Sequence, residues 1–271
     1  MKTQEKYEKY KPKKFFGQNF LVDDNISKKI IKQLEIQDDD VIVEIGPGQG
    51  ALTKHLVNEA KRYFAVEIDT GIADKLENDY GGSVKIIRGD FLKFNLQKDI
   101  KLNRGERLKI IGNIPYNITS EILFKLFDVS NIVKCAVLMV QREVARRLIA
   151  KPNTKDYGIL AVQTQMNCIP KLLFDVPPTS FFPKPNVHSS VIKLDFSEKI
   201  YEVMSGTVFT QLVRSAFGKR RKVMSNSLKE FFIENNIDKA DIDFDFTRRP
   251  ENLSVPEFVQ LSNELTAVID K

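Results

Sequence analysis

The chain has 271 residues, a mass of 31.1 kDa and an ordinary globular composition, a length compatible with one large domain plus a small one. Its 42 Lys and Arg against 36 Asp and Glu give a net charge of +6 and a pI near 9.1, which permits a polyanionic partner without requiring one. Two cysteines and two histidines argue against a disulfide framework or a metal site, and no apolar run approaches the roughly 20 residues of a membrane span, so we expect a cytoplasmic protein with no metal and no membrane contact.

The N-terminal segment contains a charged stretch, an aromatic stretch and a predicted helix. Residues 1–14 are charged and lack apolar periodicity, which indicates an arm. The following FFGQNFL places Gln18 and Asn19 between phenylalanines, a pattern that favours a lid packed over another part of the molecule. Apolar residues then recur at helical spacing from Ile26 to Leu34, so we expect a helix there.

A buried strand followed by a glycine-rich turn predicts a nucleoside site. The strand at residues 41–45 leads through Gly46, Gly48 and Gly50 into a helix, which lets the backbone approach a ligand closely. The next strand, RYFAVEID, ends near Glu67, 21 residues after Gly46. Doubly wound nucleotide sites place at this spacing the carboxylate that binds the ribose hydroxyls. A dehydrogenase is the rival interpretation, but G-P-G-Q-G does not match its pyrophosphate fingerprint G-x-G-x-x-G.

Two further predicted strands also end in polar residues. VKIIRGDFLKF ends in Asp90, which can cap a helix or accept a hydrogen bond from an adenine amino group, with Phe91 or Ile68 packing on the ring. LKIIGNIPY ends in the Asn-Ile-Pro-Tyr stretch at residues 113–116, where the proline stops the sheet ladder. Open α/β sheets bind ligands at the carboxyl ends of their strands. The sequence therefore predicts one site at this edge.

The middle of the chain continues the α/β pattern. A helix at about residues 120–127, the strand CAVLMV and the helix QREVARRL with its PNTKDYG loop precede an expected sixth strand at residues 159–170. The proline-rich loop PPTSFFPKPNV carries Phe181 and Phe182 before a seventh strand at VIKLDF. If these two rings are exposed they can stack on a base, and if they are buried they belong to the core.

The C-terminal part is helical in pattern and locally basic. We expect helices at residues 203–217, 223–235 and 256–268. Between the first two lies GKRRK, and Arg248 with Arg249 forms a second basic pair. Such runs are solvated loops or, in a basic chain, sites that grip phosphates.

With these stretches assembled, the chain resembles the KsgA-type small-subunit ribosomal RNA adenine dimethyltransferases over nearly its whole length. The supporting stretches are FGQNFLVD, VEIGPGQGALT, EID, GDFLKF, GNIPYNITS, QREVARRL with PNTKDYG, PPTSFFPKPNV and AFGKRRKVMSNSL. The resemblance implies a Rossmann-like class I methyltransferase domain, with a seven-stranded, mostly parallel sheet and the N-terminal arm, over residues 1–197. It implies a small helical RNA-contacting domain over residues 198–271.

The resemblance also implies roles for individual residues, with S-adenosyl-L-methionine as the cofactor. The implied cofactor-binding residues, of which Glu67 serves the ribose and Asp90 the adenine, are Asn19, Leu21, Gly46, Glu67, Asp90 and Asn113. The implied catalytic residues are Asn113, Ile114, Pro115 and Tyr116. Two aromatic residues, Tyr116 and Phe181, are expected to stack on the target base. The expected RNA-binding residues are Lys219, Arg220, Arg221, Lys222 and Arg248.

The implied activity is dimethylation of the exocyclic amines of two adjacent adenines in the 3′-terminal hairpin loop of small-subunit (16S) rRNA, by a monomer that acts on this RNA or on an immature small ribosomal subunit. Ile114 departs from the leucine more common in the KsgA type and is shared with the related Erm methyltransferases of large-subunit (23S) rRNA. The Erm-like activity is therefore the near alternative. A non-catalytic RNA-binding assembly or transcription factor is a further alternative, which the intact glycine turn, Glu67, Asp90 and Asn-Ile-Pro-Tyr stretch disfavour. A small-molecule methyltransferase is a third, and the basic helical C-terminal part argues against it.

A mechanism follows from the chemistry of the adenine amine, whose lone pair is delocalised into the ring. We expect the Asn113 side-chain oxygen and the Ile114 carbonyl to accept its two hydrogens, which aims the nitrogen lone pair at the methyl group. Pro115 disfavours α geometry at Ile114 and so helps to fix that carbonyl. Stacking on Tyr116 and Phe181, at about 1–3 kcal/mol per ring, offsets the extrusion of the base.

Overall fold

The computed structural model describes residues 18–198 and 200–270, so the arm expected at residues 1–14 lies outside the described residues. The chain divides into two compact units, Met1–Ala145 with Lys171–Ser197, and Arg146–Pro170 with Glu198–Lys271. The expected division after residue 197 differs from this grouping in residues 146–170, which belong to the second unit. Across the described residues, none of the helices has the length and apolar character that a membrane crossing requires.

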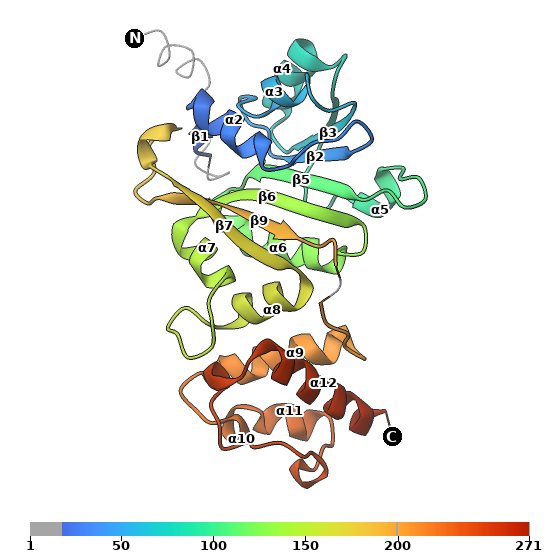
Figure 1. The fold of residues 1–271 in the computed structure, drawn as a ribbon, viewed down its shortest axis with the longest axis vertical. Coiled ribbons are helices and arrows are strands. Elements are labelled where there is room, and N and C mark those ends of the chain that lie inside the picture. The colour runs from blue at the N-terminus through green and yellow to red at the C-terminus, as the bar shows by residue number, and fades with distance from the viewer. Residues whose placement is uncertain (1–17, 199, 271) are drawn as a thin grey trace. The chain divides into compact units, whose positions relative to one another are not determined.

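The first unit is built on a seven-stranded sheet with the order β4-β3-β2-β5-β6-β9-β7 (Figure 1). Its strands are β2 (Val41–Ile45), β3 (Arg62–Glu67), β4 (Lys85–Arg88), β5 (Leu108–Asn113), β6 (Val133–Gln141), β7 (Ile169–Val176) and β9 (Ser189–Asp195). The strands from β4 to β6 pair in parallel, and β9 pairs antiparallel with β6. This arrangement confirms the predicted Rossmann-like, mostly parallel sheet.

Helices connect the parallel strands, as βαβ crossovers require. The helices of this unit are α2 (Asp24–Lys32), α3 (Thr53–Leu56), α4 (Thr70–Tyr80), α5 (Leu96–Asp99) and α6 (Thr119–Asp128), while α7 (Arg142–Leu148) runs into the second unit. The order of the sheet reverses beside β2, whose neighbours are β3 and β5. A doubly wound sheet opens a crevice at such a switch point, outside the carboxyl ends of its strands.

A separate two-stranded sheet joins the N-terminal segment to the proline-rich loop. Strand β1 (Phe20–Leu21) pairs antiparallel with β8 (Phe181–Phe182), which follows the short 3₁₀ turn η3 (Pro178–Ser180). The ring of Phe20 packs against the glycine turn, because a Cβ on Gly48 would lie 3.1 Å from its Cδ1. Phe20 therefore lies over the turn, as the lid interpretation predicted, while residues 15–17 of the aromatic stretch lie outside the described residues.

The prediction of a sixth strand at residues 159–170 is wrong. Residues Ile159–Asn167 form helix α8, and the strand begins only at Ile169. A short apolar run cannot by itself distinguish a strand from a buried helix. Here the buried side of the run, including Ala161 and Val162, packs in the helical core of the second unit.

The second unit is a helical domain with its own core. Besides α8 it contains α9 (Gly206–Gly218), α10 (Met224–Ser227), α11 (Lys229–Glu234) and α12 (Val255–Ile269), with 3₁₀ turns η4 (Lys239–Asp241) and η5 (Pro250–Asn252). Tyr157, Phe209 and Phe258 are its largest fully buried side chains. The single helix expected at residues 223–235 is divided at Leu228 into α10 and α11.

Candidate active site

A cavity of about 370 Å³ lies where β2, β3 and β5 end. Every residue that the sequence assigned to cofactor binding or catalysis lines it, namely Asn19, Leu21, Gly46, Glu67, Asp90, Asn113, Ile114, Pro115 and Tyr116. The topology explains this convergence, because parallel strands present their carboxyl ends at one edge of the sheet. The structure thus brings together residues that are up to 97 positions apart in the chain.

The glycine turn forms one wall of the cavity and is tied to the next strand. Gly46 has φ +60°, and a Cβ at this position would project into open space rather than into protein atoms. A ligand can therefore approach the backbone there. The Gly46 amide donates to the Val66 carbonyl over 3.0 Å, and the Gly48 amide donates to Glu67 Oε2 over 3.0 Å.

Glu67 is buried and is oriented by backbone donors. Besides the Gly48 amide, the Asp69 amide donates to its Oε1 over 2.8 Å. Burial raises the pKa of Glu67, and the nearby Asp69 carboxylate adds to this, while the backbone amides oppose it. Each carboxylate oxygen can accept a second hydrogen bond. Glu67 is therefore a pre-oriented acceptor for a pair of hydroxyl groups in the cavity.

Asp90 lies at the start of a loop that hydrogen bonds from Lys125 on α6 hold in place. The Leu92 amide donates to Asp90 Oδ1 over 2.9 Å, which leaves Oδ2 as an acceptor for a donor in the cavity. The Lys125 ammonium donates to the carbonyls of Leu92 and Phe94 over 2.8 and 2.6 Å, and burial lowers its pKa.

The structure distinguishes between Ile68 and Phe91, the two candidates for packing on an adenine ring. Ile68 is 45% exposed and lines the cavity, whereas Phe91 is buried and does not line it. Ile68 is therefore the apolar side chain that a ring bound beside Asp90 would meet.

The Asn-Ile-Pro-Tyr stretch has a fixed backbone and a fixed amide. Asn113 Nδ2 donates to the Asn19 carbonyl over 2.8 Å, so the opposite side of the amide presents Oδ1 as an acceptor. The Ile114 amide donates to the Met139 carbonyl over 3.0 Å, and the Thr119 hydroxyl donates to the Pro115 carbonyl over 3.1 Å. The stretch is thereby anchored to β6 on one side and to the start of α6 on the other.

Glu44 belongs to the same cavity, although sequence reasoning missed it. It lies within β2, is 1% exposed and lines the cavity. The hydroxyls of Thr53 and Tyr63 both donate to its Oε2, the former over 2.8 Å. Burial raises the pKa of Glu44 to about 7, and the negative charge of Glu67 contributes to the shift. The available signal was a carboxylate inside an otherwise apolar buried strand.

Phe181 does not line the cavity in this structure. It is 4% exposed, lies in the core of the first unit and pairs across the two-stranded sheet with Leu21. The neighbouring Phe182 points to the other face of β8 and is half-buried. Stacking of Phe181 on a base stays a prediction, and it requires the ring to leave this packing.

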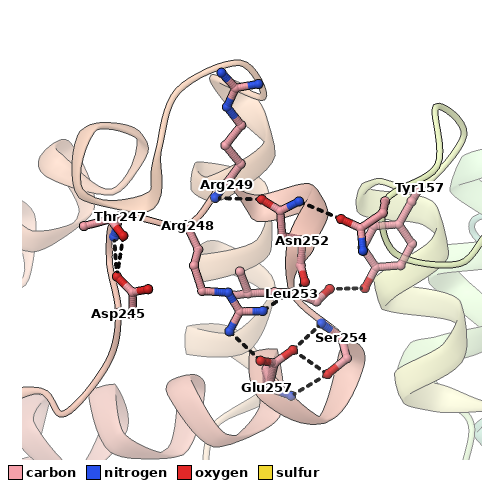
Figure 2. Close-up of polar contacts among 10 residues, drawn as sticks. Tyr157, Asp245, Thr247, Arg248, Arg249, Asn252, Leu253, Ser254 and Glu257 are labelled. Carbon is pink, nitrogen blue, oxygen red and sulfur yellow. Dashed lines mark hydrogen bonds and ion pairs between the residues drawn. The ribbon is translucent and has the colours of Figure 1, made fainter.

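The second unit engages two of the predicted RNA-binding arginines internally. Figure 2 shows Arg248 directed at Glu257, with Nη1 2.5 Å from Oε1 and Nη2 donating to the Asn252 carbonyl over 3.0 Å. Arg220 contacts Glu251 over 2.9 Å and donates to the carbonyls of Lys155 and Thr154. These guanidinium groups hold loops of the unit together, a placement that does not support their expected role on RNA.

The other basic residues of this segment are placed differently. Lys219 forms an exposed ion pair with Glu230 over 2.8 Å, the kind of pair that contributes little to stability. Arg221 and Lys222 are exposed, and their side chains form no ion pair with another described residue. The guanidinium of Arg249 extends away from the contacts drawn in Figure 2. Arg221 and Lys222 therefore remain as candidates for phosphate contacts.

Fold and site together define a Rossmann-like protein with a cavity, lined by Glu67, Asp90 and Asn113, at the switch point of its sheet. The family model described as "Ribosomal RNA adenine dimethylase" matches residues 9–267. The chain is 42% identical to Ribosomal RNA small subunit methyltransferase A of Chlorobium phaeobacteroides (strain BS1), covering 99% of each chain. It is 38% identical to the protein of that name from Francisella tularensis subsp. tularensis, covering 95% of this chain and 99% of the relative.

Two solved structures agree with the fold. A dimethyladenosine transferase from Plasmodium falciparum aligns with a TM-score of 0.70 at 25% identity, over 91% of this chain and 95% of its own. The 23S rRNA methyltransferase ErmE aligns with a TM-score of 0.61 at 24% identity, over 92% and 100%, and is a likeness of fold. The chain belongs to the ribosomal RNA adenine dimethylase family and is an S-adenosylmethionine-dependent rRNA adenine methyltransferase.

Proposed function

We propose that this protein dimethylates the exocyclic amines of two adjacent adenines in the 3′-terminal hairpin loop of small-subunit rRNA, with S-adenosyl-L-methionine as methyl donor. It acts as a cytoplasmic monomer during small-subunit biogenesis. The observation that carries the proposal is the Asn113 amide, which the Asn19 carbonyl orients beside a cavity that also presents Glu67 and Asp90.

The cavity fits this cofactor in size and in its chemical groups. Pockets that enclose a drug-sized ligand have volumes of about 300–1,000 Å³, and this cavity falls within that range. Glu67 would accept the ribose hydroxyls, Asp90 Oδ2 the adenine amine, and the open space at Gly46 would admit the methionine part. When bound, the cofactor supplies a methyl group that its sulfonium already makes electrophilic.

The protein's task is then to present the amine of the substrate adenine. Asn113 Oδ1 and the Ile114 carbonyl accept the two amine hydrogens, which draws the lone pair out of the ring plane and aims it along the transfer direction. The two anchors of the stretch keep these acceptors in place. Alignment of two reactants can lower a barrier by roughly 7–11 kcal/mol, so no strong base is needed before the nitrogen attacks.

RNA contacts outside the cavity come from the second unit. We assign phosphate contacts to Arg221 and Lys222, because they are exposed and not engaged in ion pairs with described residues, and to Lys219, which can exchange Glu230 for a phosphate. The isoleucine at position 114 does not change the assignment to small-subunit rRNA. Its side chain is buried over Gly112, where a Cβ would lie 2.9 Å from its Cδ1.

The test supplies methyl-labelled cofactor together with unmethylated small and large ribosomal subunits. We expect label in small-subunit RNA, recovered as N6,N6-dimethyladenine at two adjacent positions after nuclease digestion and mass spectrometry. Label in large-subunit RNA would move the assignment to the Erm-like activity. Binding of RNA without any transfer would leave only a non-catalytic assembly function.

A further inference from the structure

The hydroxyl of Tyr116 is tied to a buried serine that no part of the predicted mechanism uses. Tyr116 Oη and Ser189 Oγ lie 2.7 Å apart. Ser189 is 0% exposed, and it stands at the first position of β9, directly after the proline-rich loop. The bond therefore links the catalytic stretch after β5 to a strand that lies 73 residues further along the chain.

Ser189 is itself held rigidly. It pairs with Gln141 at the end of the antiparallel β6–β9 ladder, and the residue before it, His188, accepts a hydrogen bond from the Arg142 amide over 3.0 Å. Its hydroxyl is thus a fixed point attached to the sheet. Because the backbone is fixed, the hydroxyl can move only by rotation about the χ1 angle of Ser189.

Tyr116 is held at its other end by its backbone. It opens the 3₁₀ turn η2 (Tyr116–Ile118), and the Thr119 hydroxyl lies 3.4 Å from its carbonyl oxygen. A tyrosine ring still turns about χ1 and χ2 when only its backbone is fixed. A hydrogen bond at the far tip of the ring restrains both rotations. Burial raises the pKa of Tyr116, so its phenol stays neutral and able to form this bond at physiological pH.

We propose that Ser189 is a positioning residue of the methyl-transfer site: its hydroxyl holds the Tyr116 ring in the one orientation in which it serves as a stacking platform for the substrate adenine. The inference rests on the proposed function. A base that stacks on a ring takes its plane from that ring, so a ring that swings would move the amine relative to Asn113 Oδ1 and the Ile114 carbonyl. Small misplacements of this kind lower the rate of transfer without lowering affinity for the cofactor.

The adjacent Ser190 offers a matched control. It is also 0% exposed and also hydrogen-bonded through its side chain, but to Asp175 Oδ1 over 2.5 Å. Successive residues of a strand point to opposite faces, so Ser190 does not reach Tyr116. Ser190→Ala therefore removes a buried serine hydroxyl from the same strand and leaves the platform intact.

The first experiment is a double-mutant cycle on methyl transfer to unmethylated small subunits, with Ser189→Ala, Tyr116→Phe and the double variant. Each single variant should lower kcat by about 3- to 10-fold, the range that one lost hydrogen bond gives, with the Kd for the cofactor unchanged. The double variant should lose no more than either single variant, because both remove the same bond. Losses that multiply in the double variant would overturn the proposal, as would a Ser190→Ala loss equal to that of Ser189→Ala.

The second experiment observes the ring directly in the protein without RNA. With ring-¹³C-labelled tyrosine, the NMR signal that disappears in Tyr116→Phe is that of Tyr116. Ser189→Ala should shift this signal and lower its order parameter, whereas Ser190→Ala should leave both unchanged. An unaltered Tyr116 signal in Ser189→Ala contradicts the proposal whether or not the wild type methylates RNA. If the wild type transfers no methyl group, the proposed function fails, and the NMR result still decides whether Ser189 holds the ring.

Discussion

Two pairs of glutamates, one pair in each unit, are satisfied in opposite ways. In the first unit, Glu44 and Glu67 are buried at the cavity, and within the described part of the chain neither forms an ion pair; hydroxyls and backbone amides satisfy them instead. In the second unit, Glu251 and Glu257 are paired with arginines. Burial raises the pKa of Glu44 to about 7, whereas the hydrogen bond from Arg248 lowers the pKa of Glu257 to about 2.

This difference distinguishes carboxylates that are available to a ligand from carboxylates that hold segments of the chain together. A buried carboxylate without a cation is costly to keep charged, and such groups are found where a ligand uses them. A carboxylate already paired with a guanidinium has its charge compensated, and the pair joins two segments of chain. The same residue type thus marks function at the cavity and architecture at the two arginine pairs of the second unit.

The largest effect tests whether the chemistry resides in the first unit. We expect Asn113→Ala to lower kcat for methyl transfer by about 100- to 1,000-fold, the range for loss of one group that acts in the transition state. Cofactor affinity should fall less than in Glu67→Ala. Rates come from labelled methyl transfer and affinities from isothermal titration calorimetry.

Asn58→Ala is the matched control, because Asn58 is exposed and its Nδ2 also donates to a backbone carbonyl, that of Lys54. Its rate should equal that of the wild type. Full turnover by Asn113→Ala would remove the assignment of this amide to the reaction.

The next effect concerns the buried carboxyl of Glu44. Its pKa of about 7 exceeds the ordinary value of 4.5, so the folded state holds a proton that the unfolded state releases, and stability falls as pH rises from about 4.5 to 7. Glu44→Gln removes this dependence. The free energy of unfolding of the variant, relative to the wild type, should therefore rise by up to about 3 kcal/mol across that window in urea denaturation.

Glu257→Gln should change the pH dependence of the free energy of unfolding in the opposite sense to Glu44→Gln. Because its folded pKa is lowered, Glu257 contributes stability that is present above pH about 4.5 and is lost as pH falls toward 2. The deficit of this variant should shrink on acidification. Parallel pH profiles for the two variants would show that Glu44 and Glu257 do not differ in this respect.

A smaller effect separates the two neighbouring arginines of the basic segment. Arg220→Ala should lower the free energy of unfolding by about 1–2 kcal/mol, since it removes an ion pair and two hydrogen bonds to carbonyls from a partly exposed site. Arg221→Ala should change it by less than about 0.5 kcal/mol. Chemical denaturation of both variants gives the comparison, and equal losses would contradict the scaffold role of Arg220.

The smallest effect lies in RNA affinity. Joint replacement of Arg221 and Lys222 by alanine should weaken binding of small-subunit RNA and reduce the slope of log K against log salt concentration by about 1 for each charge removed. Filter binding at several salt concentrations measures this slope. A slope that stays at the wild-type value would show that Arg221 and Lys222 belong to a solvated loop and make no phosphate contacts.

Much of the active site could be predicted because it depends on strand ends. Glu67, Asp90 and the Asn-Ile-Pro-Tyr stretch each follow a predicted strand, and a parallel sheet brings such positions together whatever the details of packing. Gly46 was predictable for a local reason, since its positive φ favours glycine. The sequence by itself therefore determined the fold class, the cavity's main residues and, through the resemblance, the family.

Only the tertiary structure decided which side chains face one another. Residues 159–167 became a helix because they pack in the second unit, and Phe181 went into the core because β8 pairs with β1. Arg220 lies 31 positions from its partner Glu251, and Ser189 lies 73 positions from Tyr116. No local pattern encodes such partners, because burial and hydrogen bonding at these sites depend on segments that meet only when the whole chain has folded.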